Sequence, residues 1–188
     1  MSRKPIHILY PPILVLAVFL LYAVTLGHGF VWDDHVYVVG NKAYQDFDLP
    51  KIFSSLANRV EYLPLRDLTL AIDYRFWGES PFGFHLTNIL LFTCNILLIY
   101  LFAAELPFAG DDIEARKRAA FLTALFFGLH PLISESVNLI AFRNVLLSGA
   151  AFFLAAYLYA RDQNTDKSFS LRTPLLLFLA PVRPLGDN

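Results

Sequence analysis

Long apolar runs, separated by shorter charged stretches, dominate this chain. A lipid-spanning helix needs about 20 mostly apolar residues, because only its own backbone can satisfy its hydrogen-bonding groups. Four runs qualify or nearly qualify, namely Ile6–Leu26, Phe82–Ala104, the shorter Ala119–Leu132, and Leu139–Ala160. A fifth run, Pro174–Ala180, is cut short by Pro181, Arg183 and Pro184. The pattern therefore predicts an all-α membrane protein with four transmembrane helices plus a truncated fifth.

The polar stretch between the first two runs, residues 28–81, has a helical pattern of its own. Apolar residues recur there at steps of three and four, as on one face of a helix, at Leu65, Leu68, Ile72 and Phe76. A second, shorter helix is expected at Leu49–Leu56, and amphipathic helices of this kind lie in membrane interfaces. The chain thus divides into a first transmembrane helix (1–27), an amphipathic loop (28–81) and a region with the remaining helices (82–188).

Basic residues set the expected orientation, because cytoplasmic loops of membrane proteins are enriched in Lys and Arg. They precede the first run, separate the second from the third and follow the fourth, at Arg3, Lys4, Arg116, Lys117, Arg118, Arg161, Lys167 and Arg172. This predicts a cytoplasmic N-terminus and a non-cytoplasmic 28–81 loop, in which eight acidic and five basic residues give a net charge of −3. The first run is long for a cleavable signal peptide, so we expect an uncleaved signal anchor.

Composition agrees with this picture. Hydrophobic residues make up 56% of the 188 residues and charged residues only 16%, with a mean hydropathy of +0.51, whereas soluble domains carry about 45–50% and about 25%. The 15 basic and 16 acidic residues nearly balance, so no basic surplus favours a nucleic-acid partner. A single cysteine, Cys94, excludes an internal disulfide and a multi-cysteine metal site.

An acidic pair, Asp33-Asp34, follows the first apolar run. Two adjacent carboxylates repel each other and lose part of their hydration at a membrane surface, which raises one pKa unless a cation or a donor intervenes. Such a pair can take a proton from an attacking hydroxyl or bind a cation. A solvated turn that caps a following helix is the structural alternative, and the residues alone leave both interpretations open.

Arg143 lies within an apolar run, where a charge costs at least about 2.5 kcal/mol and faces a cavity or a partner. Its guanidinium has the geometry to hold a lipid phosphate with two hydrogen bonds. Snorkelling of the side chain to the outer surface is the alternative. Arg66, after Tyr62-Leu63-Pro64-Leu65, is a second candidate for a phosphate headgroup.

Three further polar residues are candidates for the wall of a pocket, namely His130, Glu135 and His85. Structural roles compete with that interpretation in each case. Ser134 or Ser136 is expected to cap the fourth helix, with Glu135 at its positive end. His130 fits a hydrogen-bonded interfacial residue, and His85 fits hydrogen bonding between helices.

Several short motifs occur in a characteristic order. They are Phe30-Val31-Trp32-Asp33-Asp34-His35, Tyr62-Leu63-Pro64-Leu65, Pro81-Phe82-Gly83-Phe84-His85-Leu86-Thr87-Asn88, Phe127-Gly128-Leu129-His130-Pro131, Glu135-Ser136-Val137 and Arg143. This set resembles the N-terminal part of membrane glycosyltransferases of the GT-C fold. It is most similar to transmembrane O-mannosyltransferases with tetratricopeptide repeats and to their bacterial relatives. The resemblance covers roughly residues 6–160.

The resemblance implies transfer of a hexose such as mannose from a polyprenyl-phosphate carrier to a protein or glycan acceptor on the non-cytoplasmic side. It implies that Asp33 is the general base and that Asp34 orients the acceptor or the base. Arg143, with Arg66 as the weaker candidate, would stabilise the departing lipid phosphate. The pocket residues His130, Glu135 and His85 would surround them. The implied partners are the donor, the acceptor and membrane lipids, without nucleic acid.

Two positions depart from the family pattern. Relatives often have Arg where this chain has Leu63, and an acid where it has Asn144. Relatives also have many more membrane helices and usually a repeat domain, so we expect a fragment or a truncated copy. A non-catalytic truncated paralogue or membrane interaction protein is the alternative, and a transporter subunit is less well supported. No cofactor is assigned; a divalent cation at the acidic pair stays open, because no second acidic motif supports it.

Overall fold

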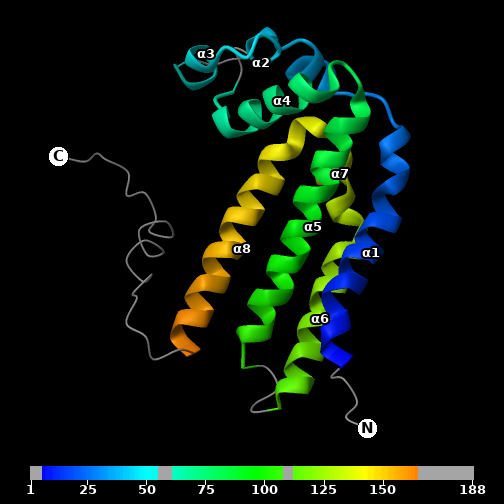
Figure 1. Ribbon diagram of the computed structural model, residues 1–188, viewed down its shortest axis with the longest axis vertical. Helices are drawn as coiled ribbons and strands as arrows, with labels where there is room; N and C mark the ends of the chain where they lie inside the picture. The colour runs from blue at the N-terminus through cyan, green and yellow to red at the C-terminus, as the bar shows by residue number, and fades with distance from the viewer. Residues whose placement is uncertain (1–5, 55–60, 108–111, 165–188) are drawn as a thin grey trace, which may run out of the picture.

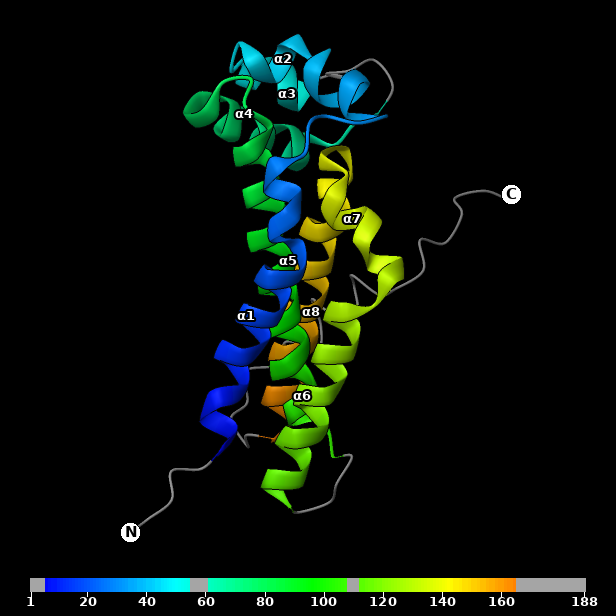
Figure 2. The ribbon, with the colours of Figure 1, turned by 90° about the vertical axis from the view of Figure 1, so that its right-hand side faces the viewer.

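The computed structural model describes residues 6–54, 61–107 and 112–164, and within these ranges all regular structure is helical. The long helices lie side by side in a bundle (Figures 1 and 2). They are α1 (Tyr10–Tyr22), extended by 3₁₀ turns at Ile6–Leu9 and Ala23–Gly27, α5 (Pro81–Glu105), α6 (Ile113–Leu129) and α8 (Arg143–Asn164). The central helix α5 packs against the other three.

Prolines lie in the first turn of two of these helices, α1 and α5, where the missing N–H costs no helical hydrogen bond. The core between α1, α5 and α6 is apolar and includes Leu14, Val18, Phe92, Ile96 and Ala124. Helices α5 and α8 approach closely at Gly149, where an added Cβ would meet the Asn95 side chain. Asn95 also donates a 2.9 Å hydrogen bond to the Leu146 carbonyl of α8. A small residue and an interhelical hydrogen bond are typical of helix contacts in membranes.

Among the described residues, three segments are long and apolar enough to cross a membrane, namely His7–Gly27, Pro81–Glu105 and Ile140–Asn164. Helix α6 and the following Pro131–Asn138 segment count as a fourth span only if they are taken together, because they are bent by 56°. The structure thus has three to four candidate spans where the sequence predicted four. The fifth predicted run, Pro174–Ala180, lies outside the described residues.

The third and fourth apolar runs are joined differently from the prediction. Helix α6 ends at Leu129, and a 3₁₀ turn (Pro131–Ile133), the short helix α7 (Ser134–Asn138) and another 3₁₀ turn (Ile140–Phe142) precede α8. The expectation that Ser134 or Ser136 caps the fourth helix is therefore wrong, because that helix begins at Arg143. The Ser134 hydroxyl instead donates a 2.6 Å hydrogen bond to the Pro131 carbonyl.

An outer layer covers one end of the bundle (Figure 1). It contains a π-helical turn (His35–Val39), α2 (Lys42–Gln45), α3 (Leu49–Ser54) and α4 (Pro64–Trp77), so helices are present at both places where the loop pattern predicted them. A small second core attaches this layer to the bundle through Val38, Tyr44, Ile52, Leu70, Phe84 and Ile140. A tight turn at Gly78 (φ +60°) then brings the Trp77 ring against Gly83, where any side chain would collide with it.

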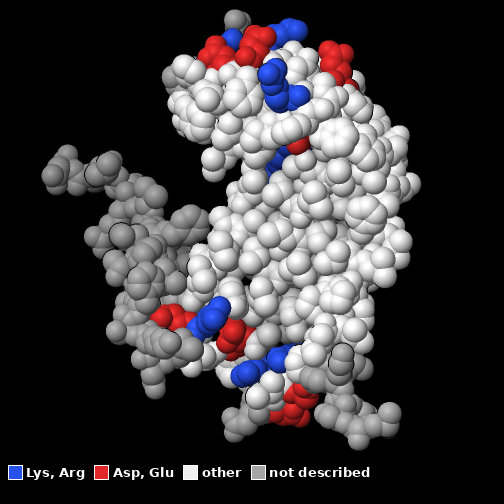
Figure 3. All heavy atoms as spheres, in the orientation of Figure 1, with Lys and Arg blue, Asp and Glu red and all other residues white. Residues whose placement is uncertain are grey.

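Helix α4 buries three charged residues together with Leu70 and Ala71, and most of its apolar stripe is exposed. Arg66, Asp67 and Asp73 are buried, whereas Leu65 is 64% and Phe76 78% exposed. On the face shown in Figure 3, charged side chains gather at the two ends of the molecule and the band between them carries almost none. This distribution is what a bundle surrounded by lipid requires, with α4 lying across its end.

Candidate functional site

The two carboxylates of the acidic pair have opposite environments. Asp33 is exposed, whereas Asp34 is fully buried. Asp34 Oδ1 accepts a 2.7 Å hydrogen bond from the Ala141 backbone N–H, and its Oδ2 accepts a 3.2 Å hydrogen bond from the Val31 N–H. Burial raises the pKa of Asp34 above its ordinary value, although these backbone donors oppose the shift. Asp34 therefore ties the outer layer to the break that precedes α8.

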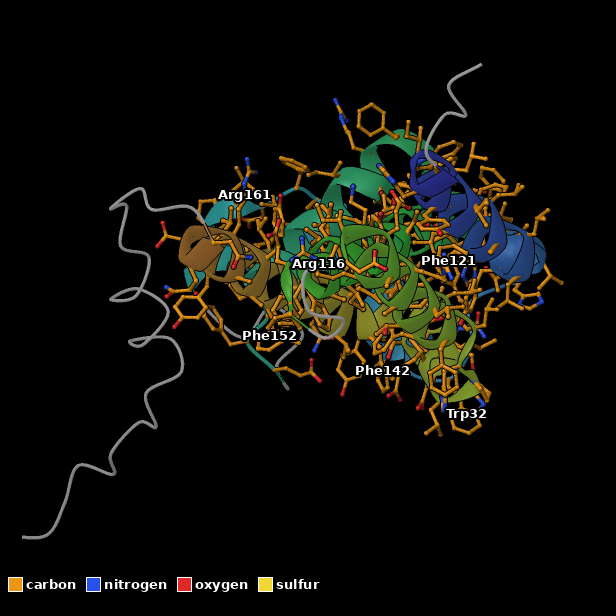
Figure 4. The ribbon with its side chains drawn as sticks, turned by 90° about the horizontal axis from the view of Figure 1, so that it is seen from below. Trp32, Arg116, Phe121, Phe142, Phe152 and Arg161 are labelled. Atoms are coloured by element: carbon orange, nitrogen blue, oxygen red, sulfur yellow. The ribbon has the colours of Figure 1, made fainter. Side chains whose placement is uncertain are left out.

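The turn that carries Asp33 has a strained backbone and is held by backbone hydrogen bonds. Trp32 has a φ of +46°, a conformation rare for a bulky side chain. It is 82% exposed and lies at the edge of the molecule seen from below (Figure 4). The Asp33 carbonyl accepts hydrogen bonds from the N–H groups of Val36 and Tyr37, at 3.0 and 2.9 Å. These bonds lead into the π-helical turn, a conformation often found at functional sites.

Arg66, on the first turn of α4, is 98% buried yet incompletely paired. Its Nη1 lies 2.7 Å from Glu61 Oε2 and its Nε lies 3.1 Å from Asp67 Oδ1. The guanidinium carbon is 5.3 Å from the centre of the Tyr37 ring. Its Nη2 has no hydrogen-bond partner within the described ranges. A buried guanidinium with a spare donor is suited to receive an anion.

Two hollows meet at Arg66. The larger, of about 330 Å³, lies between the start of α4 and the first turns of α8 and includes Leu65, Leu147 and Ala151 in its mostly apolar wall. The smaller, of about 180 Å³, is lined by Tyr37 and Ala141 among others. Arg66 and Asn144 line both. Together they form a groove, here called the Arg66 groove, in which Arg66 and its ion-pair partner Glu61 lie beside one apolar arm.

Arg143 is fully buried outside this groove, and its donors are engaged within the protein. Its Nη1 lies 2.6 Å from Asp73 Oδ2. Its Nε donates to Asn88 Oδ1 at 2.8 Å, and its Nη2 donates to the Phe84 carbonyl at 3.0 Å. Arg143 thereby connects the start of α8 with α4 and α5. Asp34 and Arg66, by contrast, both contact the backbone of Ala141. Asp34 accepts from its N–H, and Arg66 Nη1 lies 3.5 Å from its carbonyl oxygen.

The predicted pocket residues lie apart from the Arg66 groove. His130 is half-buried at the end of α6, where its Nδ1 accepts a 3.3 Å hydrogen bond from the Leu132 N–H. Glu135 is exposed on α7. His85 is buried in α5, with its ring edge-on to that of His28 at 6.4 Å between ring centres. None of these three lines either hollow.

Sequence reasoning missed Tyr37 and Asn144 as groove residues, and the buried acids Asp67 and Asp73 of α4. The polar spacing of α4 contained a signal, since Arg66 and Asp73 are seven residues apart and so lie on one helical face. Nothing in the pattern indicated Tyr37. In the part of the chain that the structure describes, no group of three or more His, Cys, Asp or Glu side chains is placed to hold a metal ion.

Comparison with known proteins gives relatives of one kind. The chain is 33% identical to protein O-mannosyl-transferase TMTC4 of Homo sapiens over 87% of its length, and 31% identical to protein O-mannosyl-transferase TMTC3 of Mus musculus over 84%. It is 28% identical to protein O-mannosyl-transferase F38B6.6 of Caenorhabditis elegans over 80%. These alignments span only 25%, 17% and 23% of the respective relatives.

No family model and no solved structure matches the chain. The resemblance to transmembrane O-mannosyltransferases, found from the ordered motifs, is nevertheless confirmed by relatives at about 30% identity over most of the chain. The chain is therefore homologous, over most of its own length, to a part of the membrane protein O-mannosyl-transferases.

Proposed function

We propose that this chain provides the acceptor-activating and donor-phosphate-binding part of a glycosyltransferase. In this proposal a hexose such as mannose passes from a polyprenyl-phosphate carrier to a protein hydroxyl on the non-cytoplasmic side. One observation carries the proposal: Arg66, whose buried Nη2 has no hydrogen-bond partner within the described ranges, lines a mostly apolar groove. The names of the relatives supply the sugar and the class of acceptor.

The Arg66 groove matches the two parts of a lipid-linked donor. The phosphate oxygens would accept hydrogen bonds from Arg66 Nη2, while Leu65, Leu147 and Ala151 would contact the first isoprenoid units. When the bond between the anomeric carbon and the phosphate oxygen breaks, negative charge grows on the phosphate beside the guanidinium. A fixed cation at the place where charge develops is among the largest catalytic contributions.

Asp33 is the proposed general base. It is exposed and sits on the turn that leads to Tyr37, which lines the groove. Its carboxylate would take the proton from the acceptor hydroxyl as that oxygen attacks the anomeric carbon. The buried Asp34 would hold this turn against Ala141, a positioning role. Arg143 would hold α4 on α8 and so keep Arg66 in place, instead of binding the phosphate itself.

Two variants of the full-length protein test these roles separately. Arg66→Gln should weaken binding of a polyprenyl-phosphate mannose at least ten-fold, because the charge-assisted hydrogen bonds to phosphate are lost. Asp33→Asn should retain donor binding and lose transfer by about 10²–10⁴-fold. Binding is measured by titration in lipid nanodiscs, and transfer by mass spectrometry of a protein acceptor.

An exposed arginine at the other end of the bundle, Arg118, supplies a matched control for the charge change. Arg118→Gln should bind the donor as the unmodified protein does. Unchanged donor binding in Arg66→Gln would refute the phosphate assignment. Transfer at the wild-type rate by well-folded Asp33→Asn would refute the assignment of the base.

A further inference from the structure

A third hollow lies in the outer layer and has no part in the proposed transfer. It has a volume of about 240 Å³ and lies against the π-helical turn. His35 of that turn lines it, whereas Tyr37, two residues further on, lines the Arg66 groove. Residues two apart in a helical turn point to different sides. The two sites are therefore distinct and adjoin the same turn.

Aromatic rings from three separate segments line this hollow. Phe30 precedes the acidic pair, Tyr44 belongs to α2 and Tyr74 to α4. The Tyr44 and Tyr74 rings are nearly perpendicular, at 79° with 5.8 Å between their centres. The Tyr44 hydroxyl already donates to the Val38 carbonyl, which is a backbone group of the outer layer. Tyr44 is only 1% exposed, so the half-buried rings of Phe30 and Tyr74 are the ones that a ligand would contact.

Among the polar side chains that line the hollow, which are those of His35, Gln45 and Glu79, the one carboxylate favours a cation over a neutral sugar. The side-chain amide of Gln45 donates a 2.9 Å hydrogen bond to the Val39 carbonyl, so fewer of its hydrogen-bonding groups are left for a sugar. Glu79, by contrast, is exposed at the rim and makes no ion pair within 4.0 Å in the described part of the chain. Aromatic faces beside a carboxylate attract an ammonium or guanidinium group.

We propose that this hollow binds the Lys or Arg side chain of a protein acceptor, beside the hydroxyl that receives the sugar. This inference rests on the proposed function for the identity of the acceptor. The charge of the surrounding segment agrees with a basic partner, because residues 28–81 carry a net charge of −3. Asp33 and His35 are two residues apart, so their Cα atoms are at most about 7 Å apart. The basic residue should therefore lie within about four positions of the acceptor Ser or Thr.

Binding of paired peptides tests the hollow without requiring transfer. One fluorescent peptide carries a Ser acceptor with a Lys three residues away, and its partner carries Gln in place of that Lys. The chain in lipid nanodiscs should bind the Lys peptide about five-fold more tightly, the increment that one cation–π contact provides. Glu79→Gln and Tyr74→Leu should each remove most of this preference.

Asp46→Asn is the matched control, because Asp46 is an exposed acid of the same layer that does not line the hollow. It should keep the five-fold preference although the charge of the segment changes equally. A preference that survives in Glu79→Gln, or no preference in the unmodified chain, would overturn the proposal. Phosphocholine that binds with Glu79 dependence, when the Lys peptide shows no preference, would assign the hollow to a lipid headgroup and also overturn it.

Transfer measurements separate this proposal from the proposed function. If the Lys preference in binding is found but no peptide receives a sugar, the hollow stands and the transfer function fails. If the Lys and Gln peptides bind and are glycosylated equally well, the transfer function stands and the hollow has no part in acceptor choice.

Discussion

A single backbone N–H, that of Ala141, explains why two adjacent aspartates behave differently. The apolar run from Leu139 to Ala160 gave no sign of an interruption, yet the helix begins only at Arg143. The break frees the Ala141 N–H, and Asp34 accepts from it at 2.7 Å across 107 positions of sequence. An acidic pair was visible in the sequence, but which of its members is buried depended on this long-range contact and could not be predicted.

Two substitutions at Asp34 distinguish its hydrogen bond from its charge. Asp34→Asn keeps the Oδ1 acceptor for the Ala141 N–H but replaces the Oδ2 acceptor of the Val31 N–H by an NH2 group. Asp34→Ala removes both acceptors and leaves the buried Ala141 N–H without a partner, at a cost of about 1–3 kcal/mol. We therefore expect Asp34→Ala to lower the apparent Tm in detergent micelles more than Asp34→Asn does. Asp33→Ala, at the exposed neighbour, is the control and should have little effect. Equal losses in Asp34→Asn and Asp34→Ala would contradict the acceptor role.

The raised pKa of Asp34 also predicts a dependence on pH. Because burial raises the folded-state pKa above the unfolded one, the folded protein holds a proton that the unfolded chain has lost between these two values. Stability contributed by Asp34 is therefore present below its ordinary pKa and is lost as pH rises through the raised value. Burial raises the pKa of Asp67 in the same direction. The difference in stability between the wild type and Asp34→Asn therefore isolates the contribution of Asp34. Chemical unfolding at several pH values should show the wild type losing stability relative to Asp34→Asn as pH rises; a constant difference would refute this.

Helix α4 illustrates what periodicity can and cannot predict about an element. The three- and four-residue spacing from Leu65 to Phe76 correctly indicated a helix, now seen at Pro64–Trp77. A helix in a soluble protein would bury that stripe, but here the opposite face, with Arg66 and Asp73, is buried and the stripe is exposed. Periodicity alone does not say which face is buried; an exposed apolar stripe is what a helix in a bilayer interface would have, because lipid would then cover it.

Fluorescence from Trp77, the last residue of α4, tests whether this end of the helix meets lipid. The chain has two tryptophans, so Trp32→Phe leaves Trp77 as the single reporter. Trp77 is 42% exposed, and we expect lipids brominated near the headgroup end of their chains to quench it more strongly than lipids brominated near the methyl end. The soluble quencher acrylamide is the control for exposure to water. Strong quenching by acrylamide with none by brominated lipid would place this end of α4 in water.

At the scale of the whole molecule, the outer layer and the bundle are joined by polar contacts as well as by the small second core. An ion pair of 2.6 Å between Arg143 Nη1 and Asp73 Oδ2 links α8 to α4. A 2.8 Å hydrogen bond from Arg143 Nε to Asn88 Oδ1 links α8 to α5. The sequence identified Arg143 as a charge that needed a partner. Asp73 could not be predicted as that partner, because it lies 70 positions away in the sequence and because periodicity did not indicate which face of α4 is buried.

This buried ion pair should be costly to break and cheap to replace. Removal of one partner strands the other charge and costs about 3–5 kcal/mol, whereas an apolar pair of similar volume is often neutral or stabilising. We expect Arg143→Met and Asp73→Leu each to lower the apparent Tm strongly, and the double variant to recover most of the loss. Arg118→Gln, at an exposed site near the other end of the bundle, controls for the change in net charge. If the double variant were stable but no longer bound the lipid-linked donor, Arg143 itself would contact the phosphate; retained binding would leave that contact to Arg66, with the ion pair acting only to join the two parts of the molecule.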